Sequence, residues 1–176
     1  MSKIIFITGL EETGRDTIVE MTIGGSKNSL MDFKHVSFEK LGISGLKDEL
    51  SDTVRKARDG FYKNVEREVS DALRSGLSVI VEGPITMKTE NGYLPLVPKE
   101  FFEAFSPDVI MLFETPHERG NSRIDWKQQH INRAYAAMYA SLGGSLLKII
   151  EVSKGEVKDA LRECKEVMSS VMGKGV

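Results

Sequence analysis

The sequence predicts an α/β fold of three layers, in which a five-stranded parallel sheet is flanked by helices on both faces. Three observations carry this prediction. Five short segments are almost continuously apolar, which is typical of strands buried on both faces. Segments with helical spacing of apolar residues alternate with them. The chain of 176 residues has no proline-rich or glycine-rich linker, so we expect one domain over residues 1–176.

The five predicted strands are short and are spread along the whole chain. They cover residues 4–8, 33–38, 77–81, 109–113 and 146–152. The second segment alternates between apolar and polar residues, whereas the others are nearly unbroken apolar runs. Since helical segments separate these strands, the sheet is expected to be parallel.

Helical periodicity is visible in three of the connecting segments. The first predicted helix covers residues 15–23 and is expected to end at Gly24 and Gly25, because glycine pairs commonly end helices. A long, charge-rich helical segment covers residues 45–76, with an interruption near Gly60. The last predicted helix covers about residues 154–172.

Composition excludes several classes of function. The net charge of −2 and the dispersed lysines and arginines give no footprint for nucleic acid. The single cysteine, Cys164, permits neither an intrachain disulfide nor a thiolate metal cluster. No apolar run approaches the length of a membrane span, and the amino terminus lacks the pattern of a signal peptide. We therefore expect a cytoplasmic protein with no membrane partner.

The first chemistry-bearing segment follows the first predicted strand directly. Gly9 and Gly14 have the spacing of the Walker A pattern G-x-x-x-x-G-K-[ST], in which loop amides cradle phosphates, the Lys contacts the outer phosphates and the hydroxyl binds Mg²⁺. Arg15 replaces the Lys, and Asp16 replaces the Ser or Thr. We expect these four residues, with Thr17, to form a nucleotide-binding loop of altered chemistry, in which Arg15 is also a catalytic candidate.

Carboxylates near this loop oppose a triphosphate. Each like-charge contact at about 4–6 Å costs roughly 3–4 kcal/mol at an effective dielectric constant near 20, before screening. Thr17 could offer the missing hydroxyl, although one helix position rotates a side chain by about 100°. The acidic side chains either form a pocket for a cation or are simply solvated; they are Glu11, Glu12, Asp16 and Glu82.

Two downstream segments carry a resemblance to a known family. Residues 88–98 match a loop of the form K-T-x-x-G-Y-L-P-x-x-P, and residues 129–150 match a Q-x-x-N-R-A-x-A-A segment followed by a glycine and a K-I-I strand. Both segments resemble the archaeal type of adenylate kinase, a P-loop nucleoside monophosphate kinase, and the resemblance covers nearly the whole chain.

The resemblance implies a P-loop NTPase fold that binds ATP at the glycine loop. It further implies an AMP-binding helical region at about residues 45–75 and a lid at about residues 115–127. Mg²⁺ is expected only together with ATP, and a homo-oligomer is compatible with the family. Matched positions imply nucleotide contacts by four residues, with Arg133 also a catalytic candidate; they are Arg55, Lys88, Arg133 and Gly144. Glu82, at the end of the third strand, is implied as a metal contact through water.

Departures from the family leave two functions open. The lid segment is short and carries only Arg119 and Arg123, and the family's Asp-Thr-His after the third strand has become Glu82-Gly83-Pro84. We favour an adenylate-kinase-like protein with a degraded ATP site, weak or absent phosphoryl transfer, and a nucleotide-responsive or interaction role. The alternative is an active ATP:AMP phosphotransferase that uses Arg15 and Thr17. A pocket re-used for another anionic metabolite is a third possibility.

Overall fold

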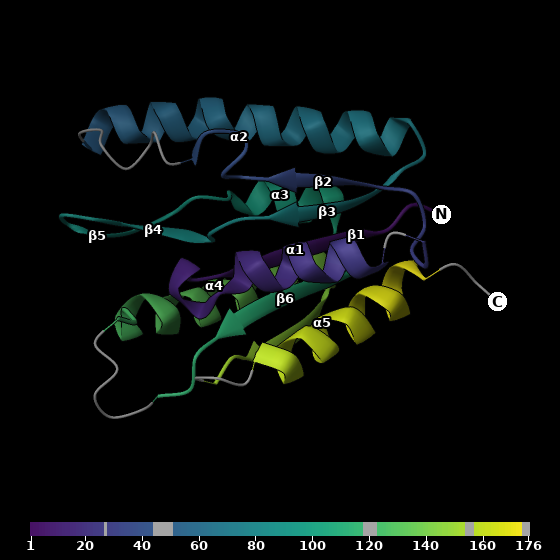
Figure 1. Cartoon of the computed structure of the whole chain (residues 1–176). Helices are drawn as coiled ribbons and strands as arrows, with labels where there is room; N and C mark the ends of the chain where they lie inside the picture. Colours follow the sequence, from purple (N-terminus) through teal and green to yellow (C-terminus); the bar gives the residue numbers. More distant parts are fainter. Residues whose placement is uncertain (27, 44–50, 118–122, 154–156, 174–176) are drawn as a thin grey trace.

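A five-stranded parallel sheet forms the centre of the computed structural model, which describes residues 1–26, 28–43, 51–117, 123–153 and 157–173, with the side chains of residues 51–55 left out (Figure 1). The strand order is β2-β3-β1-β6-β7. The strands are β1 (Ile4–Gly9), β2 (Phe33–Ser37), β3 (Ser78–Glu82), β6 (Val109–Glu114) and β7 (Leu146–Glu151). The predicted number and direction of the strands are therefore confirmed.

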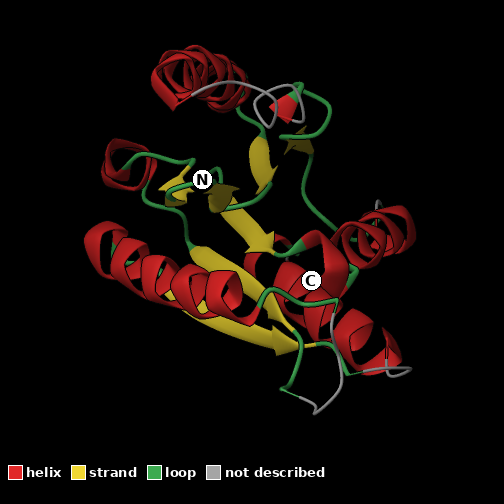
Figure 2. Ribbon diagram, turned by 90° about the vertical axis from the view of Figure 1, so that its left-hand side faces the viewer, coloured by secondary structure: helices red, strands yellow, loops and turns green. Residues whose placement is uncertain are grey.

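Helices cover both faces of this sheet, as Figure 2 shows. On one face lie α1 (Arg15–Ser26) and α5 (Val157–Met172), and on the other lie α2 (Ser51–Arg74), α3 (Lys99–Phe105) and α4 (Trp126–Gly143). Alternate residues of β1 enter the two cores: Ile5 and Ile7 pack toward α1 and α5, and Phe6 packs toward the opposite layer. The predicted three-layer arrangement is confirmed.

Two predicted helix boundaries are wrong, and both involve glycine. Helix α1 continues through Gly24 and Gly25, and α2 continues through Gly60 without a break. A glycine in a helix costs only about 1 kcal/mol relative to alanine. In α2, the burial of Phe61 and Val65 against the sheet outweighs that cost. Tertiary packing therefore decides these boundaries.

Three features of the fold are absent from the sequence prediction. Strands β4 (Thr86–Thr89) and β5 (Gly92–Pro95) form an antiparallel hairpin, where the sequence suggested only a loop. Helices α3 and α4 were also not predicted. In α4 the apolar residues Met138 and Leu142 are exposed while Tyr139 is buried, which blurs the helical period. None of the described helices is both long enough and apolar enough to cross a membrane.

Candidate functional site

The candidate site lies at the carboxyl edge of the sheet, where the segments that follow β1, β3 and β6 begin. The cavities at this edge include three with volumes of about 720, 270 and 100 Å³. The smallest lies beside Arg15 and Glu82, and the middle one lies between the loop after β1 and the β4–β5 hairpin. The largest lies beyond β6 and β7.

The loop after β1, residues 9–14, has the predicted strand-turn-helix form and is called the glycine loop below. Gly9 has a φ of 139°, and a Cβ there would stand 2.5 Å from the Phe113 carbonyl oxygen, so no other residue fits. A single 3₁₀ turn, η1 (Glu11–Thr13), follows. Gly14, with a φ of 77°, then leads into α1 at Arg15.

Backbone groups of the glycine loop bond to one another. The Thr13 amide donates to the Leu10 carbonyl at 3.2 Å, and the Gly14 amide donates to the Glu11 carbonyl at 2.9 Å. The Thr13 hydroxyl adds a bond to Leu10 O at 2.6 Å. A phosphate cradle needs successive loop amides that point outward at the anion. Two of the amides in this loop, those of Thr13 and Gly14, instead donate to carbonyl oxygens of the loop itself.

Arg15 lies inside this loop rather than extending over it. Its side chain is only 1 % exposed. Nη1 donates to the Gly9 carbonyl at 2.6 Å, and Nε donates to Asp16 Oδ1 at 2.7 Å. The Nε atom also lies 3.5 Å from Glu82 Oε1. The guanidinium therefore bridges the two ends of the glycine loop and pairs with two carboxylates.

Glu82 is a buried carboxylate at the end of β3, with its side chain 5 % exposed. His35 Nε2 lies 2.7 Å from Glu82 Oε2, while Oε1 has Arg15 as a neighbour but no hydrogen bond. Both oxygens thus lie beside groups of the protein, and the side chain also lines the smallest of the three cavities.

The alternative in which the loop carboxylates form a cation pocket finds no support in the described residues. Among the residues that the structure describes, no group of three or more His, Cys, Asp and Glu side chains is placed to hold a metal ion. The predicted carboxylates are those of Glu11, Glu12, Asp16 and Glu82. At the position of the Walker Ser or Thr, Asp16 is bonded to Arg15. These residues do not fit a resident Mg²⁺.

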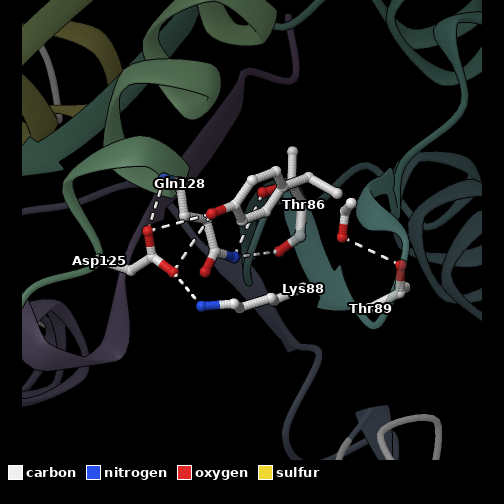
Figure 3. A network of polar contacts seen from close by, with 7 residues as sticks. Thr86, Lys88, Thr89, Asp125 and Gln128 are labelled. Carbon is white, nitrogen blue, oxygen red and sulfur yellow. Dashed lines mark hydrogen bonds and ion pairs between the residues drawn. The ribbon is translucent and has the colours of Figure 1, made fainter.

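Lys88 anchors the β4–β5 hairpin to the start of α4 (Figure 3). Its Nζ lies 2.7 Å from Asp125 Oδ2, and the Tyr93 hydroxyl donates to Oδ1 of the same carboxylate at 3.1 Å. Asp125 caps α4 by accepting from the Gln128 amide at 3.0 Å, and the Gln128 side chain donates to the Thr86 carbonyl at 3.1 Å. The hydrogen bond from Lys88 lowers the pKa of Asp125.

Arg133, in the second turn of α4, pairs with the buried carboxylate of Glu114 at the end of β6. Arg133 Nε donates to Glu114 Oε1 at 2.9 Å, and its Nη2 pairs with Oε2. This bidentate bond raises the pKa of the guanidinium. The three candidate phosphate-binding cations in the described part, Arg15, Lys88 and Arg133, each have a carboxylate partner within the chain.

Not all predicted site residues come together. Thr17 is exposed in the first turn of α1, near Asp16. Gly144 ends α4 with a φ of 66° and precedes β7, whose first residue pairs with Val109 at the start of β6. It therefore lies at the amino edge of the sheet, away from the glycine loop, and we remove it from the site. The side chain of Arg55 and residues 118–122, including Arg119, lie outside the described residues.

Sequence reasoning missed several partners at this edge. Two of them are carboxylates that pair with predicted cations: Glu114 pairs with Arg133, and Asp125 pairs with Lys88. His35 contacts Glu82. His117 contacts Trp126, with ring centroids 4.6 Å apart. One signal existed for Glu114, because it ends an apolar strand just as Glu82 does. The other contacts join segments far apart in the sequence.

Comparisons with known proteins agree with this fold. No protein-family model matches the chain. The adenylate kinase of Pyrococcus abyssi is 28% identical, with 96% of each chain covered. That of Methanothermobacter thermautotrophicus is 26% identical over 94% of this chain and 99% of its own.

Solved structures give the same fold at low sequence identity. Dephospho-CoA kinase from Campylobacter jejuni matches with a TM-score of 0.52 at 12% identity, over 97% of this chain and 99% of its own. Thymidylate kinase from Candida albicans matches with a TM-score of 0.51 at 12% identity, over 96% and 92%. Over nearly its whole length, this chain is therefore a relative of the archaeal adenylate kinases, built on the fold of the P-loop kinases.

Proposed function

We propose that this relative of the adenylate kinases transfers phosphoryl groups weakly or not at all, and that it serves as a nucleotide-responsive or interaction protein. One observation carries the proposal: the Arg15 guanidinium is buried within the glycine loop and bonded to the Gly9 carbonyl. In an active kinase of this fold, the corresponding basic group contacts the outer phosphates. Here that group is engaged with the protein.

Binding of a triphosphate at this loop has an energetic cost. Arg15 would have to leave the Gly9 carbonyl, and a hydrogen bond to a charged group contributes about 1.5–3 kcal/mol. Its departure would also leave the buried Glu82 with His35 as its remaining partner. A free energy of about 1.4 kcal/mol corresponds to a tenfold change in affinity. Loss of the bond to the Gly9 carbonyl alone therefore weakens ATP binding by roughly ten- to a hundredfold.

Charge neutralisation is the second requirement that this site meets poorly. Phosphoryl transfer depends on basic side chains and Mg²⁺ that offset charge on the moving group. Lys88 and Arg133 are paired with Asp125 and Glu114, and Asp16 stands where a hydroxyl would bind the ion. When bound with ATP, Mg²⁺ would offset negative charge on the phosphates, but the residues at this loop do not provide its usual protein ligand.

The alternative function is an active ATP:AMP phosphotransferase that uses Arg15 and Thr17. The exposure of Thr17 in the first turn of α1 favours it, because that hydroxyl can reach solvent and any bound ion. This alternative requires Arg15 to turn outward from its bonds when ATP binds.

Calorimetric titration with ATP, with and without Mg²⁺, separates the two functions, together with an assay of ATP-plus-AMP turnover. The test variant combines Arg15→Lys with Asp16→Ser, and the matched control is Arg162→Lys on the exposed side of α5. We expect no saturable binding by the unmodified chain up to about 1 mM, and a gain of about tenfold or more in the double variant.

Turnover by the unmodified chain at the rate of an archaeal adenylate kinase assayed beside it would overturn the proposal. In that case Arg15→Ala decides the mechanism. Loss of turnover in this variant would assign Arg15 as the phosphate-binding group of an active enzyme, and unchanged turnover would exclude it from that role.

A further inference from the structure

Strand β7 is the outermost strand on its side of the sheet. It pairs with β6, and no other described strand lies next to it. The amides of Leu146 and Val152 donate toward β6, with N···O distances of 3.2 and 2.7 Å. Because backbone groups point alternately to the two sides of a strand, those of Leu147, Ile149 and Glu151 point away from β6. These three residues, called the β7 edge below, offer a row of donors and acceptors to a further strand.

The surface beside the β7 edge carries little charge. Residues 134–147 are the longest stretch of the chain without Asp, Glu, Lys, Arg or His, although 28% of all residues are charged. Leu146, the first residue of β7, is 73% exposed. The charge of Lys148 is paired on α5, where its Nζ lies 2.5 Å from Glu163 Oε2. An uncharged surface beside an unpaired strand is typical of an interface with another protein chain.

Helix α4 packs on β6 and β7, and its two flanks differ. Tyr139 stacks on a ring of α3, with ring centroids 4.1 Å apart, so α3 covers that flank. Arg133 lies about 120° away around the helix axis and bonds to Glu114 at the end of β6. Ala137 and Ser141 follow one and two turns later on the flank of Arg133, and both are exposed. At these two positions the flank of α4 away from α3 therefore carries small, uncharged side chains.

A second copy of the chain fits this side of the molecule. A two-fold axis perpendicular to the sheet would place the same strand of the second copy beside β7, antiparallel to it, so that each β7 edge meets an identical one. Strands in a sheet lie about 4.8 Å apart. Since α4 covers β6 and β7, the two α4 helices would lie about two strand spacings apart, or about 10 Å. This is the distance at which helices pack against each other, and small side chains permit it.

The charges of β7 select one register for this pairing. In a register centred on Ile149, each Ile149 faces its counterpart and each Leu147 faces Glu151 of the second copy, so all outward-pointing residues are paired. Lys148 then faces Ile150 of the second copy. A register centred on Lys148 would instead set two lysines directly opposite each other, which destabilises a sheet.

The area of this side is close to what a stable dimer needs. Helix α4 has 18 residues and β7 has 6, so they are about 27 and 20 Å long. The three layers, helix, sheet and helix, stand about 25 Å high. Their side face therefore covers roughly 500–700 Å², compared with about 800 Å² per partner in a standard interface.

We propose that the chain forms a two-fold dimer in which β7 pairs antiparallel with β7 of a second copy, so that the two sheets become one, and the flanks of the two α4 helices pack together. The unpaired β7 edge and the uncharged surface beside it carry this inference. It goes beyond the proposed function and does not rest on it, because the glycine loop and the β7 edge share no residue.

Sedimentation equilibrium of the full chain tests the dimer, and hydrogen exchange tests its interface. Between about 1 and 200 µM protein, we expect a reversible change from 19.6 kDa to twice that mass, with a dissociation constant below about 50 µM. Exchange of the amides of Leu147, Ile149 and Glu151, followed by nuclear magnetic resonance, should slow about tenfold or more from the lowest to the highest concentration.

Two variants place a charge on opposite parts of the proposed interface. Leu146→Glu changes an exposed side chain at the start of β7, and Ala137→Glu changes an exposed side chain on α4. Each should weaken the dimer about tenfold or more and abolish the slow exchange of the β7 edge. The matched control is Met21→Glu on α1, where Met21 is 53% exposed, and it should leave the dissociation constant unchanged.

Several outcomes would overturn the proposal. They are a mass of 19.6 kDa at every concentration, a trimer or larger assembly, or a dimer that forms without slower exchange of the β7 edge. A dimer of equal affinity in Leu146→Glu and Ala137→Glu would also contradict it. If circular dichroism shows that Leu146→Glu does not fold, Ala137→Glu makes the same test from α4. Phosphotransferase activity, measured separately, bears only on the glycine loop.

Discussion

Replacement of Arg15 by methionine should destabilise the protein substantially, even though arginine at this position departs from the Walker A pattern. Methionine keeps most of the apolar volume of the buried side chain and removes its charge and donors. Three contacts are lost: the bond to the Gly9 carbonyl at 2.6 Å, the bond to Asp16 at 2.7 Å and the approach to Glu82 at 3.5 Å. The substitution therefore isolates the polar role of Arg15.

The magnitude follows from the two buried contacts, those with Gly9 and Glu82, because Asp16 is 47% exposed and a pair with an exposed carboxylate contributes little. A hydrogen bond from a charged donor contributes about 1.5–3 kcal/mol. Removal of one partner from a buried ion pair costs about 3–5 kcal/mol, because a buried charge is left behind. The cost of breaking the ion pair is smaller here, because the contact between Arg15 and Glu82 is long and His35 still faces that carboxylate. We expect a loss of about 3 kcal/mol in the free energy of unfolding.

Urea denaturation, followed by far-ultraviolet circular dichroism, measures this loss. The double variant Arg15→Met/Glu82→Gln should recover about 1 kcal/mol or more relative to Arg15→Met, because the uncompensated charge is removed with its partner. A loss below about 0.5 kcal/mol in Arg15→Met would refute the structural role of the arginine. If the double variant recovers no stability, Glu82 is not the carboxylate that Arg15→Met leaves unpaired.

Three further predictions concern the rest of the carboxyl edge. Asp125→Ala removes the cap of α4 and should lower the free energy of unfolding by about 1–2 kcal/mol, while Asp125→Asn, which can still cap, should lower it less in the same denaturation assay. Lys88 lowers the pKa of Asp125 in the folded state. The unmodified protein should therefore be more stable than Asp125→Asn by a margin that is complete above about pH 4 and shrinks as the pH falls further. A margin that stays constant with pH would contradict this prediction. Gly83→Ala places a Cβ 2.1 Å from the Phe38 ring and should cost about 1–3 kcal/mol, seen as a lower thermal midpoint.

The sheet could be predicted from the sequence because its central strands are buried on both faces. β1 and β6 are unbroken apolar runs, and their length and β-branched content separate them from helices. The hairpin β4–β5 carries no such signal, since its stability comes from contacts with α4 such as Lys88 to Asp125. Helix α4 was missed for a related reason: its exposed Met138 and Leu142 obscure the buried face.

The candidate site was only partly predictable. The replacements at Arg15 and Asp16 showed that the glycine loop has altered chemistry, since the Walker pattern fixes which residue types belong there. The Arg15 side chain also lies beside Glu82, a residue on another strand, and no local pattern encodes that contact. Gly144 was misplaced because a motif match gives position along the chain, not the edge of the sheet at which a turn lies.

The pairing of each cation with a carboxylate also governs how ligands arrive at the carboxyl edge. A net positive charge draws anions from a distance of about one Debye length, whereas adjacent opposite charges form dipoles whose field fades much faster. Lys88 and Arg133 form such dipoles at the surface, and the buried Arg15 forms one beneath it. These three pairs by themselves therefore contribute little to the electrostatic steering of an anion, and little to any dependence of its association rate on ionic strength.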